Sequence, residues 1–384
     1  MLKFRINKNA FLANLHSAQR AINGKVVVPV LNFVKINVTK EGLTLTGSNG
    51  RITIETFLSV TDEDAGMIID EVGGILLEVS FLSKVLSELP NYEFSLEVLE
   101  NNIVNIKSGQ TDLHLNGMNV QDYPKLKTPS QEKVLKLPVS FFKQVIKETN
   151  FAASTQESRP ILTGVCLKVE DNKTLVSTAT DAHRMSRRTV ELPHSVENFQ
   201  VTIPSKNLKE FINVFNKDDE EFEMFFSSTQ VLFKTKNVSL YTRLLDGSYP
   251  DTERIIPKNF KTTAVFDSQG LRKVMNRAAL LTSVDNSRSI QLELKRDTIT
   301  LYGNSPEIGN LKEDIEFDKK EGDDLVISFN PIFMSESLAA FGEGKIEIKF
   351  TESFRPFVMS LESKGDQFIQ LITPIRTNVA MPKK

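Results

Sequence analysis

Apolar positions recur along the chain with the period of a helix that buries one face, three or four residues apart. The first three segments with this period are 9–22, 139–152 and 268–281. Each is followed by a second helical segment, and these are 80–90, 205–215 and 330–342. Leu86, Ile212 and Leu338 occupy matching positions in the second set, 126 residues apart each time. The pattern predicts six helices in three pairs.

Between the helical segments, apolar and polar residues alternate with the period of half-buried strands. The clearest of these strand segments are 43–47, 94–98, 174–180, 223–227, 298–303 and 346–350. A Tyr-Pro pair also recurs at Tyr123 and Tyr249, again 126 residues apart. Three repeats divide the 384 residues evenly, and we predict domains at 1–127, 128–255 and 256–384, with linkers near 126–134 and 255–263.

Local signals agree with these helix boundaries. Ser140 and Asp267 stand where N-cap residues are expected, and Pro90 and Gly342 stand where helices end. Because a sheet with one apolar face needs a cover, each domain is expected to place two helices against two sheets. The predicted fold class is therefore α+β, in three tandem copies.

Charge is distributed unevenly between the helices and the rest of the chain. The formal net charge is −2. The six helical segments together hold nine Lys or Arg and four Asp or Glu, which leaves the remainder more acidic than the whole. Surface helices often carry cations without further meaning. Repeated three times, however, the bias favours a helical surface that attracts phosphate groups without reading sequence.

The sequence offers no motif for catalysis or for a cofactor. A P-loop, a GxGxxG after a strand, HExxH and GxSxG are all missing. No two of the four histidines have metal-ligand spacing, and the single cysteine, Cys166, excludes an intrachain disulfide and a cysteine zinc site. We found no signal-peptide pattern and no stretch of membrane-spanning length. We therefore expect a cytoplasmic protein that is not an enzyme and needs no cofactor.

Three segments stand out against this background: 178–188 (TATDAHRMSRR), 241–251 (YTRLLDGSYPD) and 370–376 (QLITPIR). The first places a histidine and three arginines at a strand end, although a lone histidine such as His183 is more often structural than functional. The last is apolar almost to its end, which indicates that it is buried or binds a partner.

Taken together, ATDAHRMS, the run from DGSYPD to IIP and the final TPIR resemble the bacterial DNA polymerase III beta subunits, the sliding clamps. The resemblance spans all three repeats. It implies a head-to-tail homodimer that closes into a six-domain ring, with twelve helices around the hole and sheets at the rim. Duplex DNA would pass through the hole without sequence specificity. The replicative polymerase, the clamp loader and repair proteins would bind through a short peptide motif.

A rough geometric check agrees with the resemblance. Twelve helices at ordinary packing distances would enclose a hole of about 20–28 Å, which is wide enough to hold a duplex loosely.

The resemblance also implies which residues form a pocket for the partner peptide. By matched position they are Leu162, Thr180, Ala182, His183, Arg184, Met185, Pro250, Arg254, Ile255, Phe354, Pro356, Leu371, Thr373, Pro374, Ile375 and Arg376. Ala182 and Met185 stand where relatives often have Gly and Leu, so the shape of the pocket is expected to differ more than its role.

DNA-contacting positions are implied at Lys25, Gln156, Arg159 and Lys206, whereas Ser80 replaces an Arg that some members have. At the dimer interface, Leu113 of one copy is expected to pack on Leu280 and Leu281 of the other.

Two other readings remain open from the residues alone. One is a β-rich scaffold or interaction protein that forms no ring. The other is a DNA-processing enzyme whose site is not visible in the sequence.

Overall fold

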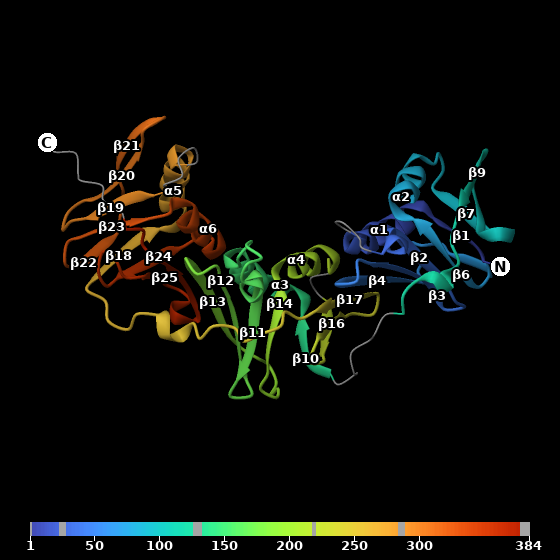
Figure 1. Ribbon diagram of the computed structural model, residues 1–384, viewed down its shortest axis with the longest axis horizontal. Coiled ribbons are helices and arrows are strands. Elements are labelled where there is room, and N and C mark those ends of the chain that lie inside the picture. The colour runs from blue at the N-terminus through green and yellow to red at the C-terminus, as the bar shows by residue number, and fades with distance from the viewer. Residues whose placement is uncertain (1, 23–27, 126–132, 217–219, 283–288, 377–384) are drawn as a thin grey trace. The chain divides into compact units, whose positions relative to one another are not determined.

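The computed structural model describes residues 2–22, 28–125, 133–216, 220–282 and 289–376 (Figure 1). The chain folds into two compact units. One comprises Met1–Lys143 and Lys206–Leu244, and the other Gln144–Ser205 and Leu245–Lys384. This division cuts the middle repeat, and the boundaries of the three predicted domains stay predictions.

All six predicted helices are present among the described residues. They are α1 (Lys8–Gln19), α2 (Val79–Glu88), α3 (Val139–Thr149), α4 (Ser205–Val214), α5 (Ser268–Thr282) and α6 (Pro331–Phe341). The starts of α2, α4 and α6 are 126 residues apart, which confirms the repeat. Short 3-10 helices supplement them: η1 (Arg20–Ile22), η2 (Pro29–Asn32), η3 (Glu100–Asn102), η4 (Val120–Asp122), η5 (Asn150–Ala152), η6 (Pro160–Thr163), η7 (Glu253–Ile255) and η8 (Gly365–Gln367).

The helix caps were predicted with mixed success. Asp267 caps α5, because its Oδ2 accepts a hydrogen bond from the Gly270 amide at 2.7 Å. Gly342 ends α6 with a φ of 76°, a conformation that favours glycine. The prediction for Ser140 was wrong: α3 already begins at Val139, so Ser140 lies within its first turn.

The first unit contains two antiparallel sheets. The strands of one, in pairing order, are β5 (Ile68–Glu71), β1 (Lys3–Asn7), β7 (Glu93–Val98), β8 (Ile103–Ser108) and β9 (Thr111–Asn116). Those of the other are β10 (Lys133–Pro138), β15 (Glu221–Phe226), β16 (Gln230–Lys234), β17 (Val238–Arg243), β4 (Ile52–Ser59), β3 (Gly42–Ser48), β2 (Phe33–Val38) and β6 (Gly73–Glu78).

The second unit repeats this plan. Its larger sheet has the order β14 (Gln200–Pro204), β11 (Gly164–Glu170), β12 (Thr174–Thr180), β13 (Arg184–Glu191), β26 (Phe368–Ile372), β25 (Phe357–Leu361), β24 (Lys345–Phe350), β18 (Thr262–Asp267) and β22 (Lys319–Gly322). Its smaller sheet has the order β21 (Gly309–Asp314), β20 (Ile299–Ser305), β19 (Ile290–Leu294) and β23 (Leu325–Phe329).

Strands from neighbouring repeats pair directly and so join the repeats. In the first unit, β17 of the middle repeat pairs with β4 of the first, with Leu240 opposite Ile54. In the second unit, β26 of the third repeat pairs with β13 of the middle one, with Gln370 opposite Ser186. Each junction is thus a continuous sheet rather than a flexible linker.

Phenylalanine dominates the cores. Among the described residues, the twelve largest side chains that are fully buried are all Phe. In the first unit, Phe142 of α3 meets Phe211 of α4 edge to face, with ring centroids 5.1 Å apart. In the second, Phe329 and Phe357 pack in the same way at 5.2 Å. Aromatic contacts therefore join two helices in the first unit and the two sheets of the second unit.

Candidate functional site

The turn between β12 and β13 is held by its own side chains. The amides of His183 and Arg184 both donate to Asp181 Oδ1 at 2.9 Å. The Thr180 hydroxyl donates to the Arg184 carbonyl at 2.6 Å and accepts from the Ala182 amide at 3.1 Å. Ala182 has a φ of 75°, which residues with a side chain rarely adopt. The hydrogen bonds of the turn therefore maintain a strained backbone.

This turn lies beside the last strand of the chain. Met185 of β13 is paired with Leu371 of β26, and the His183 carbonyl accepts from the Thr373 amide at 2.8 Å. Regular pairing ends before Pro374, which has no amide to donate. The next amide, that of Ile375, donates to the Ser328 carbonyl at 2.7 Å. The structure thus brings the first and third of the three distinctive segments together.

Two apolar clusters lie beneath this region. Met185 and Leu371 pack with Val358 and Ile369, and Ile256 and Phe260 cover them in part. Met185 and Leu371 are almost fully buried, so they form a floor rather than an open surface.

The second cluster contains Leu162, Cys166 and Tyr249. The Tyr249 hydroxyl accepts a hydrogen bond from the Thr180 amide at 3.0 Å, which ties this cluster to the turn. Burial raises the pKa of Tyr249 above its ordinary range and raises the pKa of the Cys166 thiol to about 11. Both groups are therefore neutral at physiological pH.

The remaining predicted pocket residues are more accessible. Pro356, Thr373, Pro374 and Ile375 are half-buried, and Ala182, His183, Pro250, Arg254, Ile255, Phe354 and Arg376 are exposed. Phe354 is 63% exposed, and the Arg376 guanidinium lies 6.0 Å from the centre of its ring. This is an apolar surface with a cationic edge.

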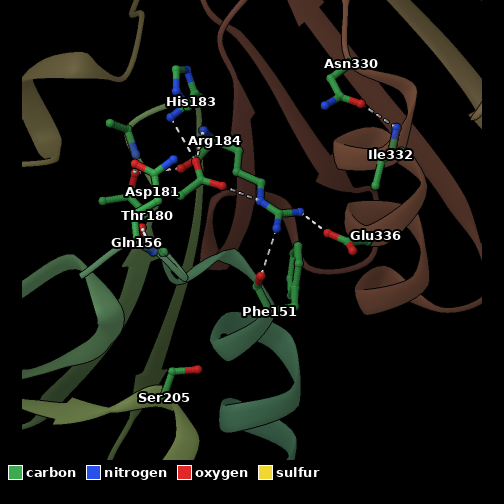
Figure 2. A network of polar contacts seen from close by, with 12 residues as sticks. Phe151, Gln156, Thr180, Asp181, His183, Arg184, Ser205, Asn330, Ile332 and Glu336 are labelled. Carbon is green, nitrogen blue, oxygen red and sulfur yellow. Dashed lines mark hydrogen bonds and ion pairs between the residues drawn. The ribbon is translucent and has the colours of Figure 1, made fainter. Parts of the chain in front are cut away.

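Two predicted positions are placed differently from the rest. Pro250 lines a separate cavity of about 190 Å³ together with Cys166 and Tyr249. Arg184 is buried, and its side chain turns towards α6, where it contacts Glu336 (Figure 2). Sequence reasoning missed Glu336 and Tyr249 as members of the site. Tyr249 belongs to a recurring motif and could have been found, whereas Glu336 is an ordinary helix residue.

The predicted DNA-contacting residues are exposed where they are described. Gln156 and Arg159 lie in the loop between η5 and η6, and Lys206 lies in the first turn of α4. Lys25 lies outside the described residues. Two of the helical cations are already paired: Arg20 contacts Glu210 at 2.5 Å, and Arg277 contacts Glu313. The positive bias of the helices is therefore partly neutralised within the protein.

At the predicted dimer interface, Leu113 and Leu281 are half-buried and Leu280 is 73% exposed. Leu113 lies in β9, an edge strand, and Leu281 packs over Gly303 of β20. A Cβ atom at position 303 would lie 2.8 Å from Leu281 Cδ2, so α5 and β20 are in close contact here.

Within the described ranges, no three His, Cys, Asp or Glu residues are grouped so that they could hold a metal ion. None of the described helices combines the length and the apolar character needed to cross a membrane.

Comparison with known proteins identifies the family. Residues 2–127, 136–251 and 253–376 match the N-terminal, central and C-terminal domain models of the DNA polymerase III beta subunit. The beta sliding clamp of Streptococcus pneumoniae serotype 4 is 45% identical over 378 residues, which cover 98% of this chain and 100% of that one. That of Lactococcus lactis subsp. lactis is 42% identical over 380 residues, with 98% and 100% covered.

Comparison with solved structures identifies the same family. The DNA polymerase III beta chain of Streptococcus pneumoniae superposes with a TM-score of 0.96 at 44% identity, covering 98% of this chain and 100% of that one. The sliding clamp of Bacillus subtilis gives 0.94 at 34% identity, covering 98% and 99%. These matches favour neither a scaffold that forms no ring nor an enzyme. With its tandem α+β domains, the chain belongs to the family of DNA polymerase III beta subunits, the bacterial sliding clamps.

Proposed function

We propose that two copies of this chain close head to tail into a six-domain ring, and that β9 of each copy pairs with β21 of the other. A sliding clamp is a processivity factor and not an enzyme, and this chain has that function: it encircles duplex DNA and tethers the replicative polymerase. The pattern of strand edges supports the proposed ring. Inside the chain, β17 pairs with β4 and β26 pairs with β13. In the first repeat, β9 corresponds to β17 and β26, and in the third repeat β21 corresponds to β4 and β13. Both β9 and β21 lie at the edges of their sheets.

The internal repeats also supply a register for this pairing. We compared each edge residue with the residue at the same pairing position in the other repeats. Leu113 of β9 takes the position of Leu240 and Gln370. Leu311 of β21 takes the position of Ile54 and Ser186. Since Leu240 faces Ile54 and Gln370 faces Ser186, Leu113 of one copy should face Leu311 of the other. The next pair would be Asp112 and Lys312, which carry opposite charges.

Such an interface is heterologous, because different strands of the two copies meet. Heterologous contacts close into rings when the rotation between copies allows it, and two copies give six domains. Pairing would also remove the two exposed strand edges, which otherwise invite non-specific association. The exposed Leu280 and the half-buried Leu281 are proposed to pack beside Leu113 in this interface.

A pair of cysteines tests the register. In a Cys166→Ala background, Leu113→Cys with Leu311→Cys should form a disulfide between copies on mild oxidation, because paired residues bring their Cβ atoms to about 4.5–5.5 Å. A non-reducing gel should show a product of two chains. The matched control, Leu113→Cys with Lys312→Cys, shifts one partner to the opposite face and should link poorly. Equal linkage in both variants, or linkage in neither, would refute the register.

We propose that Lys25, Gln156, Arg159 and Lys206 contact the DNA, and that they do so through phosphates only. Bonds to base edges would hold the ring at particular sequences, whereas phosphate contacts position a protein without reading sequence. The cations are exposed where they are described, as a transient sliding contact requires. We further propose that the protein works in the cytoplasm, where bacterial DNA is replicated.

We propose that the partner peptide binds the surface over the two apolar clusters of the second unit, a surface that we name the partner groove. Its floor would be the buried Met185, Leu371 and Leu162, and its accessible sides the residues around His183, Phe354 and Ile375. An apolar floor with a few polar groups is what anchors an extended peptide. The exposed Arg376 gives one edge of this surface a positive charge that suits a peptide with acidic groups.

A further inference from the structure

We propose that Arg184 is a positioning residue of the partner groove: its charge is used inside the protein and holds the turn that presents His183 and Ile375. This inference rests on the proposed peptide groove. Its starting point is that Arg184, although it belongs to the distinctive motif, is 9% exposed while the adjacent His183 lies at the surface.

The Arg184 guanidinium is engaged on every side that the structure describes (Figure 2). Its Nε donates to Asp181 Oδ2 at 3.0 Å, one Nη donates to Glu336, and the other donates to the Phe151 carbonyl at 3.0 Å. The Phe333 ring lies 4.5 Å and the Phe151 ring 5.3 Å from its central carbon. A planar cation with several donors suits this arrangement, and a lysine ammonium could not reproduce it.

These partners come from three separate parts of the second unit. Phe151 lies in η5 and Asp181 in the turn after β12, both in the middle repeat, whereas Phe333 and Glu336 lie in α6 of the third repeat. Figure 2 shows the Arg184 side chain extending from its strand between these elements. Arg184 therefore connects the two repeats whose surfaces make the groove.

A continuous set of hydrogen bonds leads from this cation to the groove. Asp181 receives Arg184 Nε on one oxygen and the His183 and Arg184 amides on the other. The His183 carbonyl then accepts from Thr373, which begins the segment that holds Ile375. If the Asp181 carboxylate lost its cation, the turn with its strained Ala182 would lose the group that orients it. The geometry of both groove walls depends on Arg184 in this way.

The alternative is that Arg184 contacts the peptide directly, and a double-mutant cycle distinguishes the two. The variants are Arg184→Lys, Glu336→Gln and the double variant, and the probe is a fluorescent peptide from the replicative polymerase that the wild-type protein binds. We expect Arg184→Lys to weaken binding about tenfold and Glu336→Gln to weaken it less, because the contacts of Arg184 with Asp181 and Phe151 remain. The double variant should be scarcely weaker than Arg184→Lys, because that substitution already removes the contact with Glu336. The proposal would be overturned if only Arg184→Lys lost affinity. It would also be overturned if the fold-losses of the two single variants multiplied in the double variant.

Hydrogen exchange provides a readout that does not depend on the peptide. In Arg184→Lys without peptide, the amides of His183, Arg184 and Thr373 should exchange faster, while those of β7 and β8 in the first unit should be unchanged. Unchanged exchange at the three amides would refute the positioning role.

Ile375→Ala serves as the matched control for the groove itself. It should weaken peptide binding about tenfold or more, as truncation of a binding hot spot does, without changing exchange at Arg184. If Ile375→Ala left affinity unaltered, the proposed groove would be wrong, whereas the exchange measurement would still decide the role of Arg184.

Discussion

Cys166 lies in β11 beneath the segment that carries Tyr249, and its thiol is neutral because it is buried. Desolvation raises its pKa to about 11, while a hydrogen bond with Thr202 acts in the opposite direction. A thiol this buried and this protonated is a poor nucleophile. The single cysteine of the chain is thus a packing residue, and its titration reports on the integrity of the second unit.

This burial predicts how stability depends on pH. In the unfolded chain the thiol loses its proton near pH 9, whereas in the folded protein it keeps it until about pH 11. The contribution of the buried, protonated thiol to the free energy of unfolding is therefore fully present below pH 9. It is lost as the pH rises towards 11, by up to about 2 kcal/mol. Urea unfolding of the wild-type protein between pH 8 and 10 should show the start of this decline, and Cys166→Ala should show a shallower one.

Cys166 also contributes to the raised pKa of Tyr249, so the two proteins are compared between pH 8 and about 10, below the range in which tyrosines titrate. Parallel stability curves for the two proteins would contradict the burial of an unreactive thiol at this position.

At the scale of residues, the motifs identified a turn at the end of a strand but not the direction of each side chain. The run 178–188 marked the turn correctly, and the spacing of Asp181 and Arg184 allows their ion pair, 3.0 Å between Nε and Oδ2. Whether Arg184 faces a ligand or the protein depends on Glu336, which is 152 residues away in the sequence and has no local signal. Long-range partners of this kind are set by tertiary packing.

At the scale of elements, periodicity predicted the six helices well, because each buries one face against a sheet. In α4, Leu208, Phe211 and Val214 are buried at spacings of three, while Lys206 and Lys209 are exposed. The error at Ser140 is a shift along the sequence, because α3 already begins at Val139. Which cations are neutralised could not be predicted, since Arg20 finds Glu210 in another repeat.

The exposed cations of these elements give a prediction for DNA binding. Arg159→Ala and Lys206→Ala should each weaken binding to a short duplex modestly, whatever its base sequence. Each should also reduce the slope of log affinity against log salt concentration by about one, because one phosphate contact is lost. Fluorescence anisotropy titrations at several salt concentrations measure both effects.

Arg296→Ala is the matched control, because it removes the same charge from the exposed turn between β19 and β20. Affinity losses that depended on the base sequence, or an equal loss in the control, would contradict phosphate-only contacts by these residues.

At the scale of the whole molecule, the three repeats could be read from the sequence, but not the way in which they join. The sequence of an edge strand does not specify which strand will pair with it. The pairing of β17 with β4 and of β26 with β13 is therefore known only from the structure. Once these two junctions are known, the corresponding free edges β9 and β21 suggest the third. The proposed ring therefore extends the internal symmetry of one chain to a junction between two copies.

Retention on DNA tests the ring most directly. Protein loaded onto nicked circular duplex by its clamp loader and ATP should remain bound through gel filtration, and should dissociate once a single cut makes the circle linear. Contacts with phosphates are the same on both forms, so only a closed ring distinguishes them. Retention on the circle with release from the linear form is the predicted result, and equal release from both would contradict a ring closed around DNA.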